Sequence, residues 1–321
     1  FHNFSELTIT GLTLGAVYLL MYYTNLLANN LGNISSQVND FQLATVAIAR
    51  VICTTAGRAQ FAETYARERP ESQVECCFLD LFQKNQSEFQ VNDHGLLPNL
   101  RLVCEPDLPA TEADLVAFVF RKGGDAELTR DLMQQGHLRL VEGGRMIAST
   151  DNDEDQWLHE QMQDLFPKVT RRPFRKQGTL YLATKTCPLK KQKDFDCEFA
   201  FRDRGKLIKA FSRPGVFSHR RIDLGARTLI NTMQIKRGMK VLDMGCGVGT
   251  VSLAASFAAE NVTVMALDSN PRAIQCTQRS AELNSATGIA HITDGTSNTL
   301  FVTERGGPMT PGTVRKMIAR A

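Results

Sequence analysis

Residues 241–250, with the sequence Val241-Leu242-Asp243-Met244-Gly245-Cys246-Gly247-Val248-Gly249-Thr250, take an apolar strand into an acidic residue and three alternating glycines. Glycines at a strand-to-helix turn can adopt positive φ and let a ligand approach the backbone without meeting a Cβ. The helix that follows offers unpaired N–H groups. A second apolar strand, residues 262–267, ends on Asp268, whose carboxylate could bind both hydroxyls of a ribose. The pattern predicts a nucleotide-cofactor loop.

Two classes of cofactor use such a loop, and the spacing of the glycines separates them. A dinucleotide site of the form Gly-x-Gly-x-x-Gly would need glycine at position 250, which is Thr250. The order Asp-x-Gly-Cys-Gly-x-Gly, followed by Asp268-Ser269-Asn270-Pro271, instead resembles the class I S-adenosylmethionine (SAM)-dependent methyltransferases. The resemblance implies that the glycines let SAM lie on the backbone and that Asp268 holds its ribose. A buried strand-turn-helix without a ligand is the alternative.

Length and composition are those of an ordinary globular protein. The chain has 321 residues, 43% hydrophobic and 22% charged, which favours two domains that can each bury a core. Its eight cysteines include no Cys-x-x-Cys pair and fall mostly in apolar, strand-like runs. We therefore expect reduced thiols in a cytoplasmic protein, without a disulfide framework and without a metal site.

The start of the chain carries a mostly apolar run of 15 residues, 9–23. A membrane-spanning helix needs about 20. No Lys or Arg precedes Arg50, so the basic flank of a signal peptide is missing. We expect residues 1–40 to be an N-terminal extension, either a helix packed on the first domain or sequence upstream of a start at Met21. A membrane anchor is the less favoured alternative.

Residues 51–59 repeat the strand-turn-helix pattern, and a second strand, residues 74–79, again ends on an acid, Asp80. When the two units are superimposed, Gly57 falls on Gly247, whereas Thr55 and Ala59 fall where Gly245 and Gly249 stand. Side chains there would crowd a cofactor. We interpret this as a duplicated Rossmann-like unit whose first copy has lost its ligand site. Further strands at 100–104, 115–120 and 144–149, a pair of strands within 168–184, and helices at 60–69, 125–135 and 153–165 complete the first domain.

Charge is unevenly distributed along the chain. Residues 168–240 hold 20 Lys and Arg against 5 acidic residues, while the whole chain has a net charge of only +3. Such a basic belt favours a phosphate backbone as partner. The alternative is a solvated surface that only keeps the protein soluble.

Residues 211–218, Phe-Ser-Arg-Pro-Gly-Val-Phe-Ser, and the segment 222–230 that begins Ile-Asp-Leu-Gly-Ala strengthen the RNA interpretation. Together with the glycine loop they resemble the bacterial ribosomal-RNA guanine-N2 methyltransferases, the family of the small-subunit methyltransferase C and the large-subunit methyltransferase G, over residues 45–285. The resemblance implies a degenerate first lobe that helps with RNA and a catalytic second lobe. It also implies that Phe217, Asp223, Gly225 and Ala226 border the cofactor pocket, although Asp223 could equally start a helix that packs the lobes together.

The resemblance ends after Asn284. The family orients its guanine amine with Asn-Pro-Pro-Phe/Tyr, and this sequence contains no Pro-Pro. Residues 291–294 could be the third strand, with Asp294 near the adenine amine, or a plain turn. Residues 294–300 resemble the tail of prepilin-like secreted proteins, and the second lobe is short. We therefore expect its last strands to be missing through truncation or splicing of the reading frame.

The sequence thus predicts an α/β protein with two Rossmann-like methyltransferase lobes in tandem. A degenerate lobe spans 41–186, and a SAM-binding lobe, incomplete or atypical at its end, spans 187–321. The predicted function is methyl transfer from SAM to an exocyclic guanine amine of ribosomal RNA, bound through the basic belt at 168–240, with no membrane partner; the catalytic residues are unknown. The alternatives are an inactive SAM- and RNA-binding remnant and, less favoured, an NAD-dependent oxidoreductase. The predicted cofactor residues are Asp243, Gly245, Cys246, Gly247, Gly249, Asp268, Ser269, Asp294 and Phe217.

Overall fold

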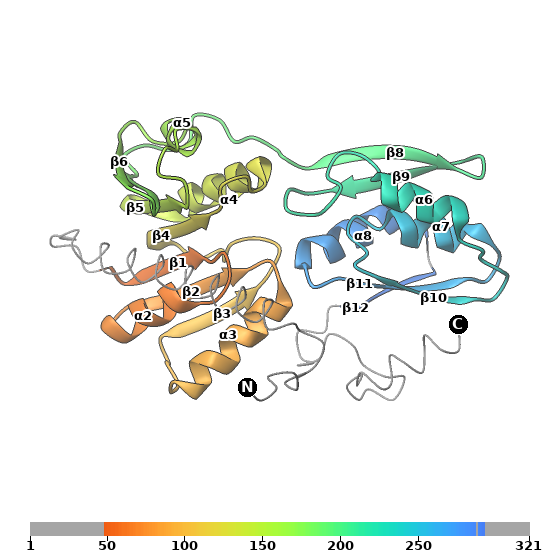
Figure 1. Cartoon of the computed structure of the whole chain (residues 1–321), viewed down its shortest axis with the longest axis horizontal. Helices are drawn as coiled ribbons and strands as arrows, with labels where there is room; N and C mark the ends of the chain where they lie inside the picture. The colour runs from red at the N-terminus through yellow and green to blue at the C-terminus, as the bar shows by residue number, and fades with distance from the viewer. Residues whose placement is uncertain (1–47, 287, 293–321) are drawn as a thin grey trace, which may run out of the picture.

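The strands of the protein form separate sheets in the two halves of the chain, each with helices packed on it (Figure 1). The structure, a computed structural model, describes residues 48–286 and 288–292. We call residues 48–186 the N-terminal part and residues 187–292 the C-terminal part. The first holds a seven-stranded sheet, and the second holds a three-stranded sheet and a two-stranded hairpin.

The N-terminal part is a doubly wound mixed sheet, as the sequence predicts. Its strand order is β3-β2-β1-β4-β5-β7-β6. The first five strands are parallel, and β7 runs antiparallel to β5 and β6. The elements in chain order are β1 (Arg50–Thr54), α2 (Gln60–Glu68), β2 (Gln73–Phe78), α3 (Leu81–Asp93), β3 (Leu100–Cys104), β4 (Ala113–Phe120), α4 (Ala126–Arg139), β5 (Leu140–Thr150), α5 (Trp157–Gln163), β6 (Val169–Phe174) and β7 (Gly178–Thr184).

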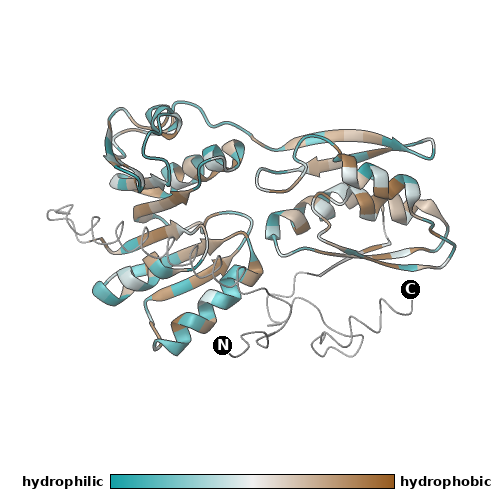
Figure 2. Ribbon diagram, viewed as in Figure 1, coloured by the Kyte–Doolittle hydropathy of each residue, from teal (hydrophilic) through white to brown (hydrophobic). Residues whose placement is uncertain are grey.

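Helices cover both faces of this sheet, which explains why its central strands are apolar at almost every position (Figure 2). Val51 and Cys53 point to the face covered by α2, where they pack in one core with Tyr65. Ile52, between them, points to the opposite face and packs in a second core with Met133 of α4. The period of two along β1 thus divides the core into two layers.

The C-terminal part places its hairpin and helices on one face of a parallel sheet with the order β10-β11-β12. Phe201 and Ile208 of the hairpin share one core with Leu253, Val264 and Ile274. The elements are β8 (Cys197–Asp203), β9 (Lys206–Ser212), α6 (Leu224–Thr232), β10 (Lys240–Met244), α7 (Thr250–Ala258), β11 (Thr263–Leu267), α8 (Pro271–Leu283) and β12 (Ile289–Ile292).

The predicted strands and helices of residues 50–283 are present, with one clear difference in length. The helix expected from residue 153 begins only at Trp157. Its early acids serve the preceding loop instead: the Asp153 carboxylate accepts a bond from the Lys176 amide at 2.7 Å, and the Asp155 carboxylate accepts bonds from the Leu158 amide and the Tyr181 hydroxyl. These bonds hold residues 153–155 in a loop, so the helix starts later than its acidic pattern indicates.

Some predictions concern residues outside the described ranges. These are the apolar run at 9–23, the position of Asp294, and the expected loss of the last strands after residue 292. Within the described ranges, no helix has both the length and the apolar character that crossing a membrane requires. In the same residues, no three His, Cys, Asp or Glu side chains gather as a metal site would need, and all the cysteines are free thiols.

Candidate cofactor site

The glycine loop between β10 and α7 adopts the left-handed backbone that its sequence predicts. The φ angles of Gly245, Gly247 and Gly249 are 79°, 56° and 81°. The amides of Gly245 and Cys246 both donate to the carbonyl of Leu267, at 2.8 and 3.0 Å, which ties the loop to the end of β11. A Cβ on Gly249 would lie 2.9 Å from the side chain of Thr277 on α8. The glycines therefore leave the loop without Cβ atoms both on its solvent side and on the side that faces α8.

A cavity of about 520 Å³ opens over this loop, at the carboxyl ends of β10 and β11. Seven of the nine predicted cofactor residues line it: Asp243, Gly245, Cys246, Gly247, Asp268, Ser269 and Phe217. Gly249 does not line it and lies against Thr277 of α8. Asp294 is outside the described residues. The cavity stands at the crevice outside the strand ends, where open α/β sheets bind their ligands.

Asp268 is fixed by the backbone around it. One of its oxygens accepts a bond from the Gly247 amide at 2.9 Å, and the other accepts one from the Asn270 amide at 2.9 Å. An ionised carboxylate has about four acceptor sites. Asp268 can therefore hold the glycine loop and still accept bonds from the hydroxyls of a ligand.

Asp243 adds a second carboxylate to the same cavity. Burial raises the pKa of Asp243, and the charge of Asp268 raises it further, while a 2.6 Å bond from the Ser252 hydroxyl acts in the opposite direction. Two carboxylates in one cavity favour a ligand that carries positive charge, such as the ammonium and sulfonium groups of SAM. They disfavour the two phosphates of NAD for the same reason. The negative charge in the cavity thus fits SAM better than a dinucleotide.

Cys246 contributes packing to the loop. Its side chain is buried, and this burial raises the pKa of the thiol to about 12. At neutral pH it is therefore protonated and a poor nucleophile. The cavity offers no reactive thiolate at this position.

Phe217 and Asp223 border the cavity from the segment between β9 and α6. The ring of Phe217 is 79% exposed at the rim. Asp223 lines the cavity and also caps α6, because its carboxylate accepts a bond from the Ala226 amide at 3.0 Å. The alternative role considered for Asp223, the start of a helix, is therefore present in the structure.

Two of the lining residues that the sequence analysis did not predict come from the N-terminal part. Leu79 and Asp80, at the end of β2, form part of the wall of the cavity. The Leu81 amide next to them donates to the Ser269 carbonyl at 2.9 Å. In the sequence, Asp80 stands out only as the counterpart of Asp268. No neighbouring residue in the sequence indicates that Asp80 lies next to the loop that follows β11.

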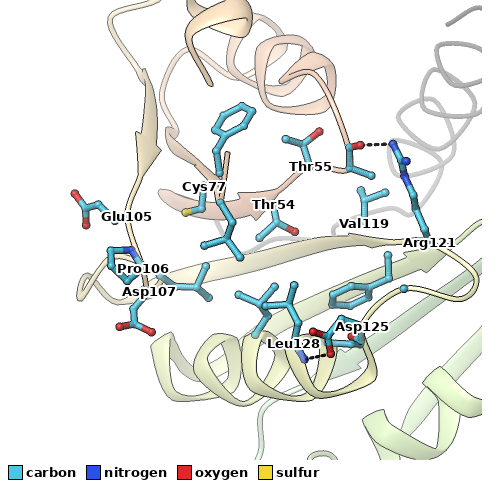
Figure 3. Close-up of a pocket in the computed structure, with 18 residues that line it drawn as sticks. Thr54, Thr55, Cys77, Glu105, Pro106, Asp107, Val119, Arg121, Asp125 and Leu128 are labelled. Carbon is cyan, nitrogen blue, oxygen red and sulfur yellow. Dashed lines mark hydrogen bonds between the residues drawn. The ribbon is translucent and has the colours of Figure 1, made fainter. Parts of the chain in front are cut away.

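The N-terminal part has a smaller cavity, of about 270 Å³, at the corresponding strand ends (Figure 3). Thr54, Thr55 and Cys77 line it, and Arg121 crosses its edge to donate to the Ala56 carbonyl. Gly57 is not among the residues with positive φ, unlike the three glycines of the other loop. These features agree with the expected loss of a cofactor site there, which stays a prediction.

Fewer basic side chains of residues 168–240 are available to a partner than the number of Lys and Arg suggests. Arg213 is buried and forms ion pairs with Asp107 and Asp196. The ammonium of Lys185 donates to two backbone carbonyls, and the guanidinium of Arg171 donates to two others. The sequence cannot separate such structural cations from exposed ones, because their partners lie far away along the chain.

Comparisons with known proteins agree with this geometry. The family described as methyltransferase small domain matches residues 208–302. Ribosomal RNA small subunit methyltransferase C of Vibrio parahaemolyticus is 39% identical over 88 residues, 27% of this chain and 26% of that protein. The protein of the same name from Shewanella piezotolerans is 25% identical over 205 residues, 63% of this chain and 59% of that protein.

A solved structure extends the comparison to the fold. The 16S rRNA N2 methyltransferase of T. thermophilus, solved with AdoMet and guanosine, superimposes with a TM-score of 0.58 at 16% identity, covering 76% of this chain and 65% of that one. The likeness shows the α/β Rossmann-like methyltransferase fold with a mixed seven-stranded sheet. The chain spans only 26% to 46% of the length of the first curated relatives that it matches. Residues 208–302 thus match the methyltransferase small domain, and the chain shows distant homology to the ribosomal RNA small subunit methyltransferases C, with the fold of the SAM-dependent methyltransferases.

Proposed function

We propose that the cavity over the glycine loop binds SAM and that the chain is a methyltransferase for ribosomal RNA. The observation that carries the proposal is a loop with three left-handed glycines, two of which line one cavity of about 520 Å³ together with the carboxylates of Asp243 and Asp268. When bound there, SAM would supply an electrophilic methyl group. Residues 243–249 would support its methionine, and Asp268 would accept bonds from its ribose.

The two parts of the chain would then be tandem methyltransferase lobes, spanning 41–186 and 187–321, of which only the second takes the cofactor. The smaller cavity of the first lobe and the side chains of Thr54 and Thr55 in it support this assignment. One SAM per chain is the expected stoichiometry. Two SAM molecules per chain would contradict the assignment of a degenerate first lobe.

An exocyclic guanine amine is the proposed acceptor. The relatives named as ribosomal RNA methyltransferases support this substrate class, and the exposed basic residues of 168–240 would bind its phosphates. A second candidate is an inactive SAM- and RNA-binding protein. It is favoured by the absence of Pro-Pro from the whole sequence, because the family orients the amine with Asn-Pro-Pro-Phe/Tyr.

Isothermal titration calorimetry with SAM, and with NAD for comparison, tests the cofactor. We expect SAM to bind and NAD not to bind. Asp268→Ala should weaken the binding of SAM by about 1.5–3 kcal/mol, because it removes charge-assisted hydrogen bonds to the ribose. Asp93→Ala, at an exposed aspartate that ends α3, should leave the affinity unchanged. Tight binding of NAD without binding of SAM would refute the proposal.

Incorporation of labelled methyl groups into ribosomal RNA separates the two candidate functions. Transfer that is abolished in Asp268→Ala would favour the active enzyme. Binding of both SAM and RNA without transfer would favour the inactive one.

A further inference from the structure

Arg272 is the largest fully buried side chain of the described residues, and it joins the two parts of the protein. It is the second residue of α8, four positions after Asp268. Its Nε donates to the Pro106 carbonyl at 2.6 Å, and its Nη1 donates to the Pro214 carbonyl at 2.8 Å. Its Nη2 lies 2.6 Å from a carboxylate oxygen of Asp131 on α4. Nη2 makes no aligned hydrogen bond, so the guanidinium is held by two hydrogen bonds and one ion pair.

A second arginine reinforces this contact. Arg213 pairs with Asp107 through two bonds, of 2.6 and 3.1 Å, and also donates to the side chain of Gln275 on α8 at 2.6 Å. Asp107 lies 3.6 Å from Arg272 as well. In Figure 3 its carboxylate points away from the small cavity of the N-terminal part. Arg272 thus takes its counter-charge from the N-terminal part, and Arg213 is shared between Asp107 of that part and Asp196 of the C-terminal part.

The first turn of α8 carries this restraint to the cofactor loop. The side-chain oxygen of Asn270 caps the helix by accepting a bond from the Arg272 backbone amide at 2.9 Å. The backbone amide of Asn270 donates to the Asp268 carboxylate. Asp268 in turn accepts a bond from the Gly247 amide. One helical turn further on, the Thr277 hydroxyl donates to the Gly247 carbonyl at 3.1 Å. Both the N–H and the C=O of Gly247 are therefore hydrogen-bonded to groups whose position depends on α8.

A buried arginine is a costly way to join two surfaces, since apolar residues of similar volume often stabilise an interface equally well. What the fork of a guanidinium adds is direction, because it fixes the angle between the groups that it binds. Here its two hydrogen bonds fix the start of α8 against Pro214 and against the loop that follows β3, and its ion pair with Asp131 holds that start next to α4.

We propose that Asp131 and Arg272 are positioning residues for cofactor binding, through which the N-terminal part sets the geometry of Asp268 and Gly247. The inference rests on the proposed binding of SAM at this cavity. It gives the N-terminal part a role in the cofactor site although that part carries no cofactor itself. It also explains why residues 79 and 80 of the N-terminal part lie in the wall of the cavity.

The test replaces the ion pair by apolar residues of similar size, Asp131→Leu with Arg272→Met in one chain. This double variant leaves no unpaired charge, but it removes the donors to the Pro106 and Pro214 carbonyls, so it should fold with a lowered denaturation midpoint, as should Val51→Ala. Its dissociation constant for SAM should rise by about tenfold or more, the size seen when groups that orient ligating residues are removed. A charge-preserving variant, Arg272→Lys, should show an intermediate loss, because it keeps the charge and loses the fork.

Val51→Ala is the matched control, because it weakens the core of the N-terminal part on the face covered by α2, away from α4. It should lower the denaturation midpoint without changing the affinity for SAM. A purely stabilising role for Arg272 predicts the opposite ranking, in which affinity follows stability. An affinity of the double variant within twofold of the wild type would overturn the inference.

Hydrogen exchange gives a readout that does not need the cofactor. In the double variant the amides of residues 245–251 should exchange faster, while those of β4 stay protected as in the wild type. Unchanged exchange in the glycine loop would overturn the inference even if SAM binds. Absence of SAM binding to the wild type, with faster exchange in the variant, would refute the proposed cofactor and leave the mechanical coupling supported.

Discussion

His137 on α4 is a single residue whose environment makes the stability of this fold depend on pH. Its side chain is 1% exposed, it packs against Phe166, and neither ring nitrogen has a hydrogen-bond partner among the described residues. Burial lowers the pKa of His137 to about 4, and the charge of Lys185 contributes in the same direction. The ring is therefore neutral at pH 7, and folding excludes its protonated form.

The sign of the resulting pH dependence follows from linkage. The folded pKa is below the ordinary value of 6.5, so the unfolded chain binds a proton first as the pH falls. The free energy of unfolding should decrease between about pH 6.5 and pH 4, by up to about 3 kcal/mol from this group. His137→Leu should remove that part of the slope in urea titrations across this range. An unchanged slope in the variant would show that the folded protein accepts the proton at His137.

Some residues of the site could be predicted from their neighbours in the sequence, and others could not. Gly245, Gly247, Gly249 and Asp268 could be predicted, because a left-handed turn after one strand and an acid after the next are written in consecutive residues. Leu79 could not be predicted as part of the cavity, because only the packing of the two parts brings it there. The burial of an arginine bonded to a carbonyl 166 positions away was equally invisible.

At the scale of elements, the hydrophobic pattern predicted the strands well, because buried parallel strands are continuous apolar runs bounded by turns. The start of α5 was harder to predict, since Asp153 and Asp155 look like the first turn of a helix but lie before it and bind Lys176 and Tyr181 of the β6–β7 region. Which acid caps a helix is decided by partners that periodicity does not reveal.

The contact between the glycine loop and α8 yields a prediction with a matched control. Gly249 and Gly238 both adopt positive φ, of 81° and 74°, but only Gly249 has α8 next to it, with Thr277 2.9 Å from an added Cβ. Gly238→Ala should cost about 1–2 kcal/mol of unfolding free energy through backbone strain alone. Gly249→Ala should cost about 1–3 kcal/mol more, because Thr277 must move. Urea unfolding measures both, and equal losses would mean that the loop can shift away from α8 without cost.

At the scale of the whole molecule, the distribution of charge is the property most open to test. Arg171 and Arg213 are used within the fold, so variants of these residues would confuse a disrupted structure with weakened RNA binding. Lys190 and Lys191 are exposed in the segment that connects the two parts. They are the better probes of a surface that faces a phosphate backbone.

Lys190→Gln with Lys191→Gln should weaken the binding of a structured ribosomal RNA fragment. It should also flatten the plot of log affinity against log salt concentration, by about 0.9 for each duplex phosphate that the variant no longer neutralises and by about 0.7 for each single-stranded one. Arg69→Gln with Lys122→Gln removes the same charge from exposed positions outside residues 168–240. Because the net charge of the two double variants is equal, a difference between their slopes reports position alone. Equal slopes for the two variants would contradict a localised RNA surface and would leave only a general attraction between a basic protein and RNA.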